Sequence, residues 1–278
     1  QADDSRRIDL IKELAYPLPV IVIAELLGIP KEDRDRFKAW SDRIVASADN
    51  VLGGAGGDSD EAHQAMASYF HEVIAERRRR PQADLISALL AAEVDGERLD
   101  EAEVIALCWL LLVAGNETTT NLIGNAILSL LEHPDQLARL RAHPDWLPSA
   151  IEEALRFRSP VQAMFRITTG EVELAGQRIP AGNRVVAWIG SANRDEGKFQ
   201  RAEFFDIARE PNPHIAFGHG IHFCLGSPLA RLEARIALGT FLARYPHFER
   251  ADDQPLEPAH GFIVHGVTSL PLHLGAGR

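Results

Sequence analysis

The amino-acid sequence predicts a mainly helical protein with small β-sheets. Apolar residues recur with helical spacing through most of residues 1–158, and this spacing returns over residues 229–243. Between residues 161 and 186, short alternating runs are separated by Gly and Pro, as in β-hairpins. The 278 residues are 46% hydrophobic and contain no repeat or linker. We therefore expect a single domain over residues 1–278.

The helical spacing and its stop signals place the expected helices individually. The longest begins at Asp100, where Glu103 stands three residues on as a capping-box partner, and it ends before Pro134. A Gly-rich stretch at 53–57 reads as a connection between two helices, because the strand, Lys and Ser/Thr of a phosphate-binding loop are absent around it. The expected helices cover residues 8–14, 21–27, 31–47, 61–79, 84–92, 100–133, 148–157 and the segment from Leu229.

The remaining segments are expected to be extended or irregular. Residues 192–214 are rich in Asn, Asp, Arg and Pro and predict a long irregular stretch. The tail over residues 262–274 predicts two short strands around Gly266.

Charge and composition exclude several classes of protein. With 29 basic and 40 acidic residues the net charge is −11, which disfavours a nucleic-acid surface. The run Arg77 to Arg80 precedes Pro81 and is expected to be a helix C-terminus, where the dipole favours cations. The longest apolar run, residues 104–114, is shorter than the ~18 residues of a membrane span, and we expect no signal peptide. Two cysteines exclude a disulfide framework, and Cys108 is expected to be a small buried hydrophobe.

Cys224 has a different setting, a glycine-rich loop over residues 217–226 that leads into a helix. Its glycines allow positive φ angles and let a flat group approach the backbone. A cysteine just before a helix N-terminus lies where the dipole favours a thiolate. Three other interpretations remain open on these residues alone: a buried thiol in a tight turn, a zinc site with His219 and His222, and a nucleophilic cysteine.

The loop resembles the haem-binding signature of the cytochrome P-450 family. Phe217, Gly220, Cys224 and Gly226 fill the four fixed positions Phe, two residues, Gly, three residues, Cys, one residue, Gly. The resemblance implies the cytochrome P-450 fold and haem b with the Cys224 thiolate as axial ligand of iron. It also implies that Phe217, Gly218 and Gly226 line the cofactor.

Further motifs stand in the order that the family requires. Ala114-Gly115-Asn116-Glu117-Thr118-Thr119 resembles the oxygen-binding groove of the central helix. Small residues at Ala114 and Gly115 would admit the macrocycle, and Glu117 and Thr118 would be the catalytic proton relay. A polar turn on a solvated helix face is the alternative, and the apolar run before the motif disfavours it.

Two charged motifs complete the resemblance. Glu153 and Arg156 resemble the family's buried structural pair, and its third partner is either Arg194 or Arg209, which the sequence does not decide between. By the same resemblance Arg166 and His222 contact the haem propionates; without it, Arg166 reads as a surface strand residue.

The function implied is that of a haem-thiolate monooxygenase. Such an enzyme inserts one oxygen atom from O2 into an apolar small molecule, by hydroxylation or epoxidation, with two externally supplied electrons. The acidic composition resembles bacterial members, which implies a cytoplasmic monomer that takes electrons from a ferredoxin and its reductase. The alternatives are a peroxide-driven peroxygenase and an inactive, truncated haem-binding remnant.

The resemblance covers the last two thirds of a typical family member. We therefore expect a fold that lacks its N-terminal third, with part of its sheet, and a chain that retains haem weakly.

Overall fold

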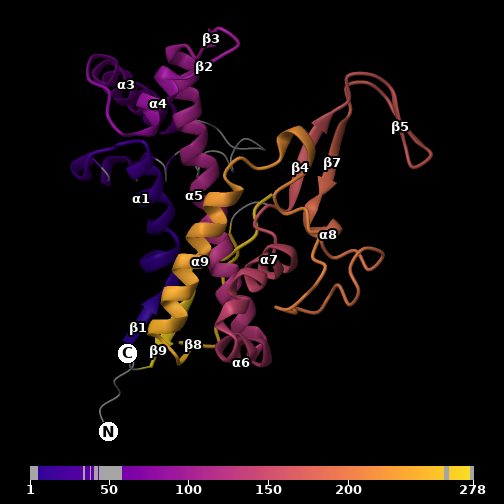
Figure 1. The fold of residues 1–278 in the computed structure, drawn as a ribbon. Coiled ribbons are helices and arrows are strands. Elements are labelled where there is room, and N and C mark those ends of the chain that lie inside the picture. The colour runs from indigo at the N-terminus through magenta and orange to yellow at the C-terminus, as the bar shows by residue number, and fades with distance from the viewer. Residues whose placement is uncertain are drawn as a thin grey trace. The chain divides into compact units, whose positions relative to one another are not determined.

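The computed structural model describes residues 6–33, 35–37, 39–40, 43, 58–259 and 263–275. Figure 1 shows its helices and strands, and its contacts divide into two compact units. The first comprises Gln1–Ala15 with Asn121–Arg278, and the second comprises Tyr16–Thr120. The longest helix, α5 (Glu101–Glu132), contributes residues to both units. The single domain over residues 1–278 stays a prediction.

The second unit is helical. It contains α1 (Pro17–Leu26), a 3₁₀ turn (Lys31–Asp33), α3 (Asp58–Arg79), α4 (Leu85–Ala91), the hairpin of β2 (Glu93–Val94) and β3 (Glu97–Arg98), and the first part of α5. Its buried cluster includes Phe37 and Phe70, whose rings pack edge to face with their centres 6.0 Å apart. The capping box at the start of α5 is confirmed. The Glu103 N–H donates to Asp100 Oδ1 and the Asp100 N–H to Glu103 Oε2, both at 2.8 Å.

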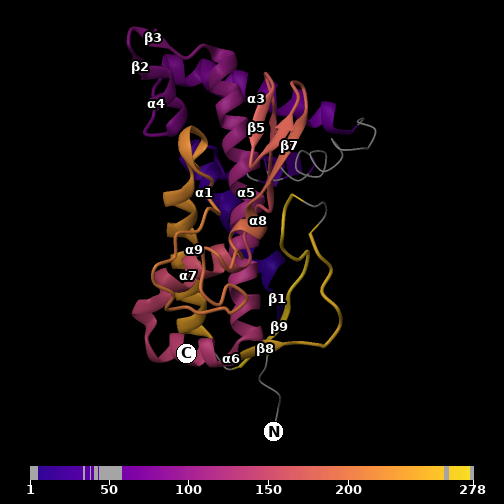
Figure 2. The ribbon, with the colours of Figure 1, turned by 90° about the vertical axis from the view of Figure 1, so that its right-hand side faces the viewer.

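The first unit combines helices with small antiparallel sheets. Its helices are α6 (Pro134–Ala142), α7 (Leu147–Phe157), α8 (Ile189–Ala192) and α9 (Ser227–Arg244), besides the end of α5, and α7 packs on α9. Three strands form one sheet in the order β1 (Arg6–Asp9), β9 (Pro271–Leu274), β8 (Phe248–Arg250), visible side by side in Figure 2. The strands β4 (Ala163–Ile167) and β7 (Arg184–Trp188) pair, as do β5 (Val172–Leu174) and β6 (Gln177–Ile179). These last two pairs confirm the hairpins expected between residues 161 and 186.

The secondary structure of the N-terminal segment differs from the prediction. The expected helix over residues 8–14 is wrong at its start, because Ile8 belongs to β1 and pairs with Leu272 of β9. Residues Ile11–Ala15 form a π-helical turn. Buried Ile8 between exposed Arg7 and partly exposed Asp9 also suits a strand, and the distant C-terminal strand β9 provides the partner.

Other boundaries differ less. Pro134 ends α5 as expected, yet it also opens α6, because proline is tolerated in a first helical turn. The tail has only β9 and the isolated bridge partners Val264 and Val267 among its described residues. The helix expected over residues 31–47 is described only in part, and the Gly-rich stretch 53–57 lies outside the described residues.

The helix α5 is more apolar than expected. It is the one helix among the described residues with the length and mean hydropathy of a membrane span, contrary to the expectation of none. Part of it nevertheless packs inside the protein. Val104 and Leu112 are fully buried, and so is Cys108, where burial raises the pKa of the thiol to about 12. Further along, Asn125 donates to the carbonyl oxygens of Arg158 and His265 at 3.1 and 2.8 Å. These contacts are those of a core helix.

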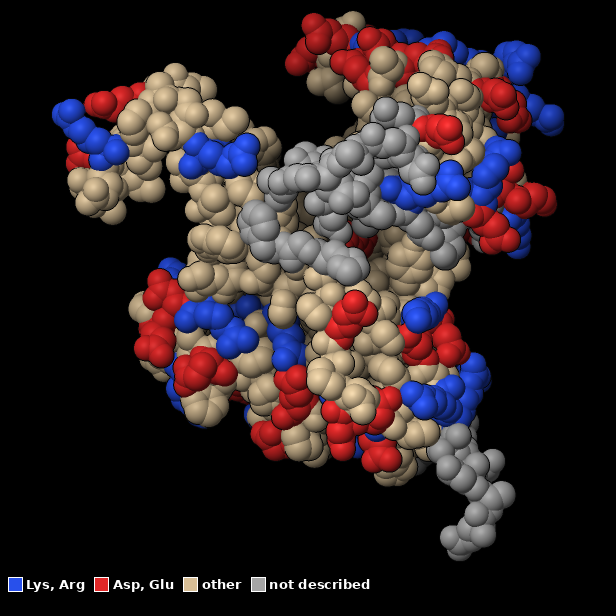
Figure 3. Space-filling model, turned by 180° about the vertical axis from the view of Figure 1, so that it is seen from behind, with Lys and Arg blue, Asp and Glu red and all other residues tan. Residues whose placement is uncertain are grey.

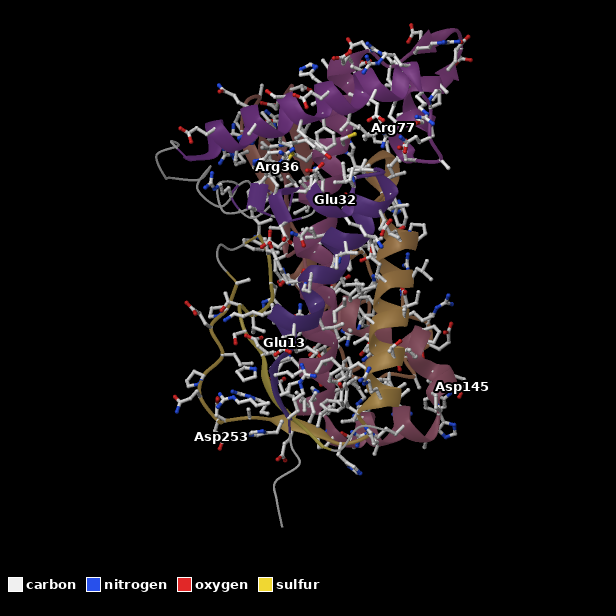
Figure 4. The ribbon with its side chains drawn as sticks, turned by 90° about the vertical axis from the view of Figure 1, so that its left-hand side faces the viewer. Glu13, Glu32, Arg36, Arg77, Asp145 and Asp253 are labelled. Atoms are coloured by element: carbon white, nitrogen blue, oxygen red, sulfur yellow. The ribbon has the colours of Figure 1, made fainter. Side chains whose placement is uncertain are left out.

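Charged side chains of both signs are interspersed on the face shown in Figure 3, where blue areas alternate with red ones. The described residues on this face therefore present mixed charge and not a single sign. The run at 77–80 lies at the C-terminus of α3 (Asp58–Arg79), as predicted, and one of its arginines is buried. Arg77, labelled on α3 in Figure 4, is only 4% exposed; it pairs with Asp84 and donates to the Gly28 carbonyl at 3.0 Å. It therefore ties α3 to the segment that follows α1.

Candidate functional site

The loop around Cys224 is a closed turn at the start of α9. Gly218 and Gly220 both adopt φ +75°, a left-handed conformation that glycine permits and that brings the chain back on itself. The Cys224 N–H donates to the Phe217 carbonyl at 2.9 Å and so closes the turn. The Ser227 N–H, the first of α9, lies 3.3 Å from the Cys224 carbonyl. The two glycines and this closure fix where the sulfur stands relative to the helix.

Apolar side chains of this loop are unusually exposed. Ile221 is 98% exposed and Leu225 81%, and Phe223 is also exposed, while Cys224 between them is partly exposed. Three large apolar side chains within five residues favour burial under another apolar group. These side chains would suit a flat, apolar cofactor that also binds the Cys224 sulfur. A side chain at Gly226 would first meet Cys224 Sγ at 4.0 Å, so this glycine leaves the space around the sulfur open.

An ion network supports the Phe217 end of the loop. The Arg231 guanidinium of α9 lies 4.4 Å from the centre of the Phe217 ring. Its Nε and Nη2 donate to the two carboxylate oxygens of Glu152 on α7, at 2.7 and 2.8 Å. The Ala216 N–H donates to His214 Nδ1, so Nε2 carries the ring proton and donates to Glu152 at 2.9 Å. Burial alone would raise the pKa of Glu152, but the bonds from Arg231 and His214 lower it to about 2.

No sequence motif indicated this network of Glu152, Arg231 and His214. Its members lie 62 and 79 residues apart from Glu152 along the chain, so no spacing connects them. The only available signal was that Glu152 directly precedes the recognised Glu153.

The predicted pair of Glu153 and Arg156 is fully buried, at 0% exposure for both side chains. Two parallel bonds of 2.8 Å join them. Arg156 also donates to the carbonyl oxygens of Asn193, Ala202 and Phe204 at 2.8 to 2.9 Å. The pair therefore holds the long irregular segment against α7.

The undecided third partner is Arg209. Its Nε donates to Glu153 Oε2 at 3.0 Å and to Oε1 at 3.2 Å. Arg194 instead lies over the Phe157 ring at 3.6 Å and donates to the Phe157 carbonyl. Burial lowers the pKa of Arg194, and the nearby Arg156 and Arg158 lower it further.

The two residues predicted to hold propionates are both exposed. Arg166 lies on β4 opposite Val185 and donates from Nη1 to the Phe165 carbonyl at 2.8 Å. His222 ends the 3₁₀ turn Gly220–His222 inside the cysteine loop. Both side chains are accessible to carboxylates, and their pairing with propionates stays a prediction.

The groove motif lies within α5, in the second unit. Its helix runs without interruption through Ala114 and Thr118, and the Thr118 hydroxyl donates to the Ala114 carbonyl at 2.8 Å. Such a bond to the preceding turn often bends a helix. A side chain at Gly115 would come within 2.7 Å of Ile23 Cδ1 on α1, so packing in this unit already requires a small residue there. Ala114 is exposed and Glu117 partly exposed. The roles of these four residues toward haem and oxygen stay predictions.

The zinc interpretation finds no support. Within the described ranges, no three His, Cys, Asp or Glu side chains lie together as a metal site, although His219, His222 and Cys224 are all described. The cysteine loop offers one sulfur with an apolar surround, which suits a haem iron and not a tetrahedral ion.

Comparisons with known proteins agree on one family. The family model described as cytochrome P450 matches residues 41–272. The chain is 49% identical over 270 residues to the putative cytochrome P450 YjiB of Bacillus subtilis, which covers 96% of this chain and 67% of that protein. It is 47% identical to cytochrome P450 107B1 of Saccharopolyspora erythraea, over 97% of this chain and 65% of the relative.

A solved structure gives the same result. The crystal structure of CYP109E1 from Bacillus megaterium in complex with testosterone matches with a TM-score of 0.91 at 46% identity. The match covers 97% of this chain and 73% of that one. The chain thus spans about two thirds of the length of its curated relatives, and its mainly helical fold with small sheets is that of cytochrome P450. The haem-binding signature, the small sheets and these likenesses together show that the chain belongs to the cytochrome P450 family.

Proposed function

We propose that this protein is a haem-thiolate monooxygenase in which Cys224 is the axial ligand of haem b. It would insert one oxygen atom from O2 into an apolar small molecule, by hydroxylation or epoxidation. The observation that carries the proposal is the closed loop that presents a partly exposed Cys224 among exposed apolar side chains at the start of α9. When bound, the haem supplies oxygen chemistry that an axial thiolate promotes by pushing electron density toward iron.

Residues of this chain would hold both the iron and the propionates of the haem. Cys224 supplies the sulfur, and Phe217, Gly218 and Gly226 shape the loop around it. Arg166 would supply a cation and His222 a hydrogen-bond donor for the propionates, since a buried carboxylate without such partners is costly. An Arg fork suits a carboxylate because it can donate two parallel hydrogen bonds.

Protons would reach the oxygen site through α5. The Thr118 hydroxyl donates to the Ala114 carbonyl, which leaves its oxygen free to accept a second hydrogen bond. Glu117, one residue before it, provides a carboxyl that can exchange protons with water. Ala114 and Gly115 keep this part of the helix free of bulky side chains.

The relatives support the substrate class. One is a vitamin D(3) 25-hydroxylase, 42% identical to this chain, and CYP109E1 has been crystallised with testosterone and with corticosterone. These are apolar small molecules, and we propose a substrate of that kind here. As in the sequence analysis, we propose a cytoplasmic monomer whose electrons come from a ferredoxin and its reductase.

The carbon monoxide difference spectrum of the reduced, haem-supplemented protein tests the proposal. Thiolate ligation should give a strongly red-shifted Soret band, and Cys224→His should move that band to the position of histidine-ligated haem. A wild-type spectrum identical to that of the Cys224→His variant would overturn the assignment and support a non-catalytic remnant.

A second measurement tests the proton relay. Thr118→Ala should retain the haem spectrum but divert electrons, so that less product and more hydrogen peroxide form per reductant consumed. Unchanged coupling would remove Thr118 from the relay. Turnover with hydrogen peroxide alone, at the rate seen with reductant and O2, would favour a peroxygenase instead.

A further inference from the structure

The network of Glu152, Arg231 and His214 has no part in the function proposed above. It joins three segments of the first unit, namely α7, α9 and the stretch before the cysteine loop. The contact between Glu152 and Arg231 is a bidentate fork, which fixes the orientation of the guanidinium as well as its distance.

The guanidinium is held against the cysteine loop. Arg231 stands seven residues after Cys224 and lies over the Phe217 ring at 4.4 Å. The carbonyl of Phe217 accepts the Cys224 N–H at 2.9 Å. Glu152 therefore acts on the loop through Arg231 and Phe217, and also through His214, whose ring lies 6.3 Å from that of Phe217.

The network also carries charge near the sulfur. The hydrogen bonds that Arg231 donates to Glu152 raise the pKa of Arg231, and the charge of a Cys224 thiolate would act in the same direction. A cation close to the thiolate would draw electron density away from iron, and the Glu152 carboxylate offsets that cation at 2.7 to 2.8 Å.

We propose that Glu152 is a positioning residue that orients Arg231 on the cysteine loop and balances its charge, and thereby sets the reduction potential of the haem iron. This inference rests on the proposed ligation of iron by Cys224. In this proposal, Glu152 and Arg231 have opposite electrostatic effects on the reduction potential.

The direction of each effect follows from its sign. Removing the carboxylate leaves Arg231 unbalanced, which stabilises the more electron-rich ferrous state and raises the potential. Removing the guanidinium leaves the carboxylate unbalanced and lowers the potential. A purely structural role would shift both variants in the same direction, because both lose the same fork.

The test is spectroelectrochemical titration of the haem-loaded wild type, Glu152→Gln, Arg231→Gln and Arg231→Lys. Glu152→Gln should raise the potential and Arg231→Gln should lower it. Arg231→Lys keeps the charge and should stay between wild type and Arg231→Gln. Glu171→Gln is the matched control, because it makes the same change of charge on a pair with Arg178 that is mostly exposed; its potential should equal that of wild type.

The outcomes separate the two proposals. Shifts of opposite sign in Glu152→Gln and Arg231→Gln, each with the red-shifted carbon monoxide band, support the inference. Shifts of the same sign, or no shift, overturn it while the wild-type band preserves the proposed function. If Glu152→Gln does not fold, the sign of the Arg231→Gln shift still tests the inference, because a potential equal to or above that of wild type overturns it. A wild type without the band overturns both proposals.

Discussion

Two neighbouring carboxylates on α7, Glu153 and Glu152, carry out different tasks. Glu153 is fully buried and binds Arg156, Arg209 and the irregular segment. Glu152 is 30% exposed and binds Arg231 and His214 beside the cysteine loop. Successive residues of a helix point about 100° apart, so one step along α7 changes the whole set of neighbours. The first carboxylate holds the irregular segment to α7, and the second holds the side chains that support the cysteine loop.

A third carboxylate in this unit, Glu233, shows how burial without a pairing cation changes the pKa. Glu233 of α9 is only 6% exposed, and its Oε2 has no hydrogen-bond partner among the described residues. Burial raises its pKa to about 7. Burial thus acts in the same direction on all such groups, and pairing decides whether the charged or the neutral form is favoured.

The largest effect is expected from Arg156→Ala. It leaves the Glu153 carboxylate buried without its main cation and removes the donors to three carbonyl oxygens. Breaking a buried pair on one side costs about 3–5 kcal/mol. Urea unfolding should show this loss, and Arg156→Lys should recover only part of it. An Arg156→Ala variant as stable as wild type would refute the structural role.

A smaller effect of opposite sign is expected from Glu233→Gln. The raised pKa of Glu233 means that stability present below pH 4.5 is lost as the pH rises through about 7. The variant cannot ionise, so it should gain about 1–2 kcal/mol over wild type above pH 7 and nothing at pH 4. Thermal unfolding at the two pH values checks this. Equal differences at both would show that Glu233 is already paired when ionised.

Glu152→Gln should lower stability at neutral pH, because it removes the charge that pairs with Arg231. The loss should be only about 1–2 kcal/mol, because water screens part of this ion pairing. The lowered pKa of Glu152 also gives a pH dependence. Its contribution is complete above pH 4.5 and is lost as the pH falls toward about 2. Acid unfolding of wild type should contain this component and that of Glu152→Gln should not.

The smallest effect is expected from Glu171→Gln. Its pair with Arg178 is 3.6 Å long, and the two side chains are 60% and 77% exposed. Exposed pairs contribute little because water and salt screen them. The urea midpoint should equal that of wild type, and a clear loss would mean that exposure is a poor guide to the value of ion pairs in this protein.

Local patterns predicted much of the secondary structure. The helical spacing located α5 and α9, the capping box fixed the start of α5, and Gly and Pro separated the strands of the hairpins. Local patterns failed at Ile8, because its strand needs a partner from the other end of the chain. They also missed α6, because a proline that ends one helix can begin another.

The site divides in the same way. The sequence predicted the cysteine loop and, through the resemblance to the cytochrome P450 family, the buried pair of Glu153 and Arg156, because each motif consists of residues a few positions apart. Three contacts could be known only from the tertiary structure. Arg209 joins that pair, Arg194 packs on Phe157, and Glu152 binds Arg231 and His214. These choices depend on which side chains the irregular segment and α9 bring to α7. Nothing in the spacing of distant residues specifies that approach, since it is set by the packing of the whole unit.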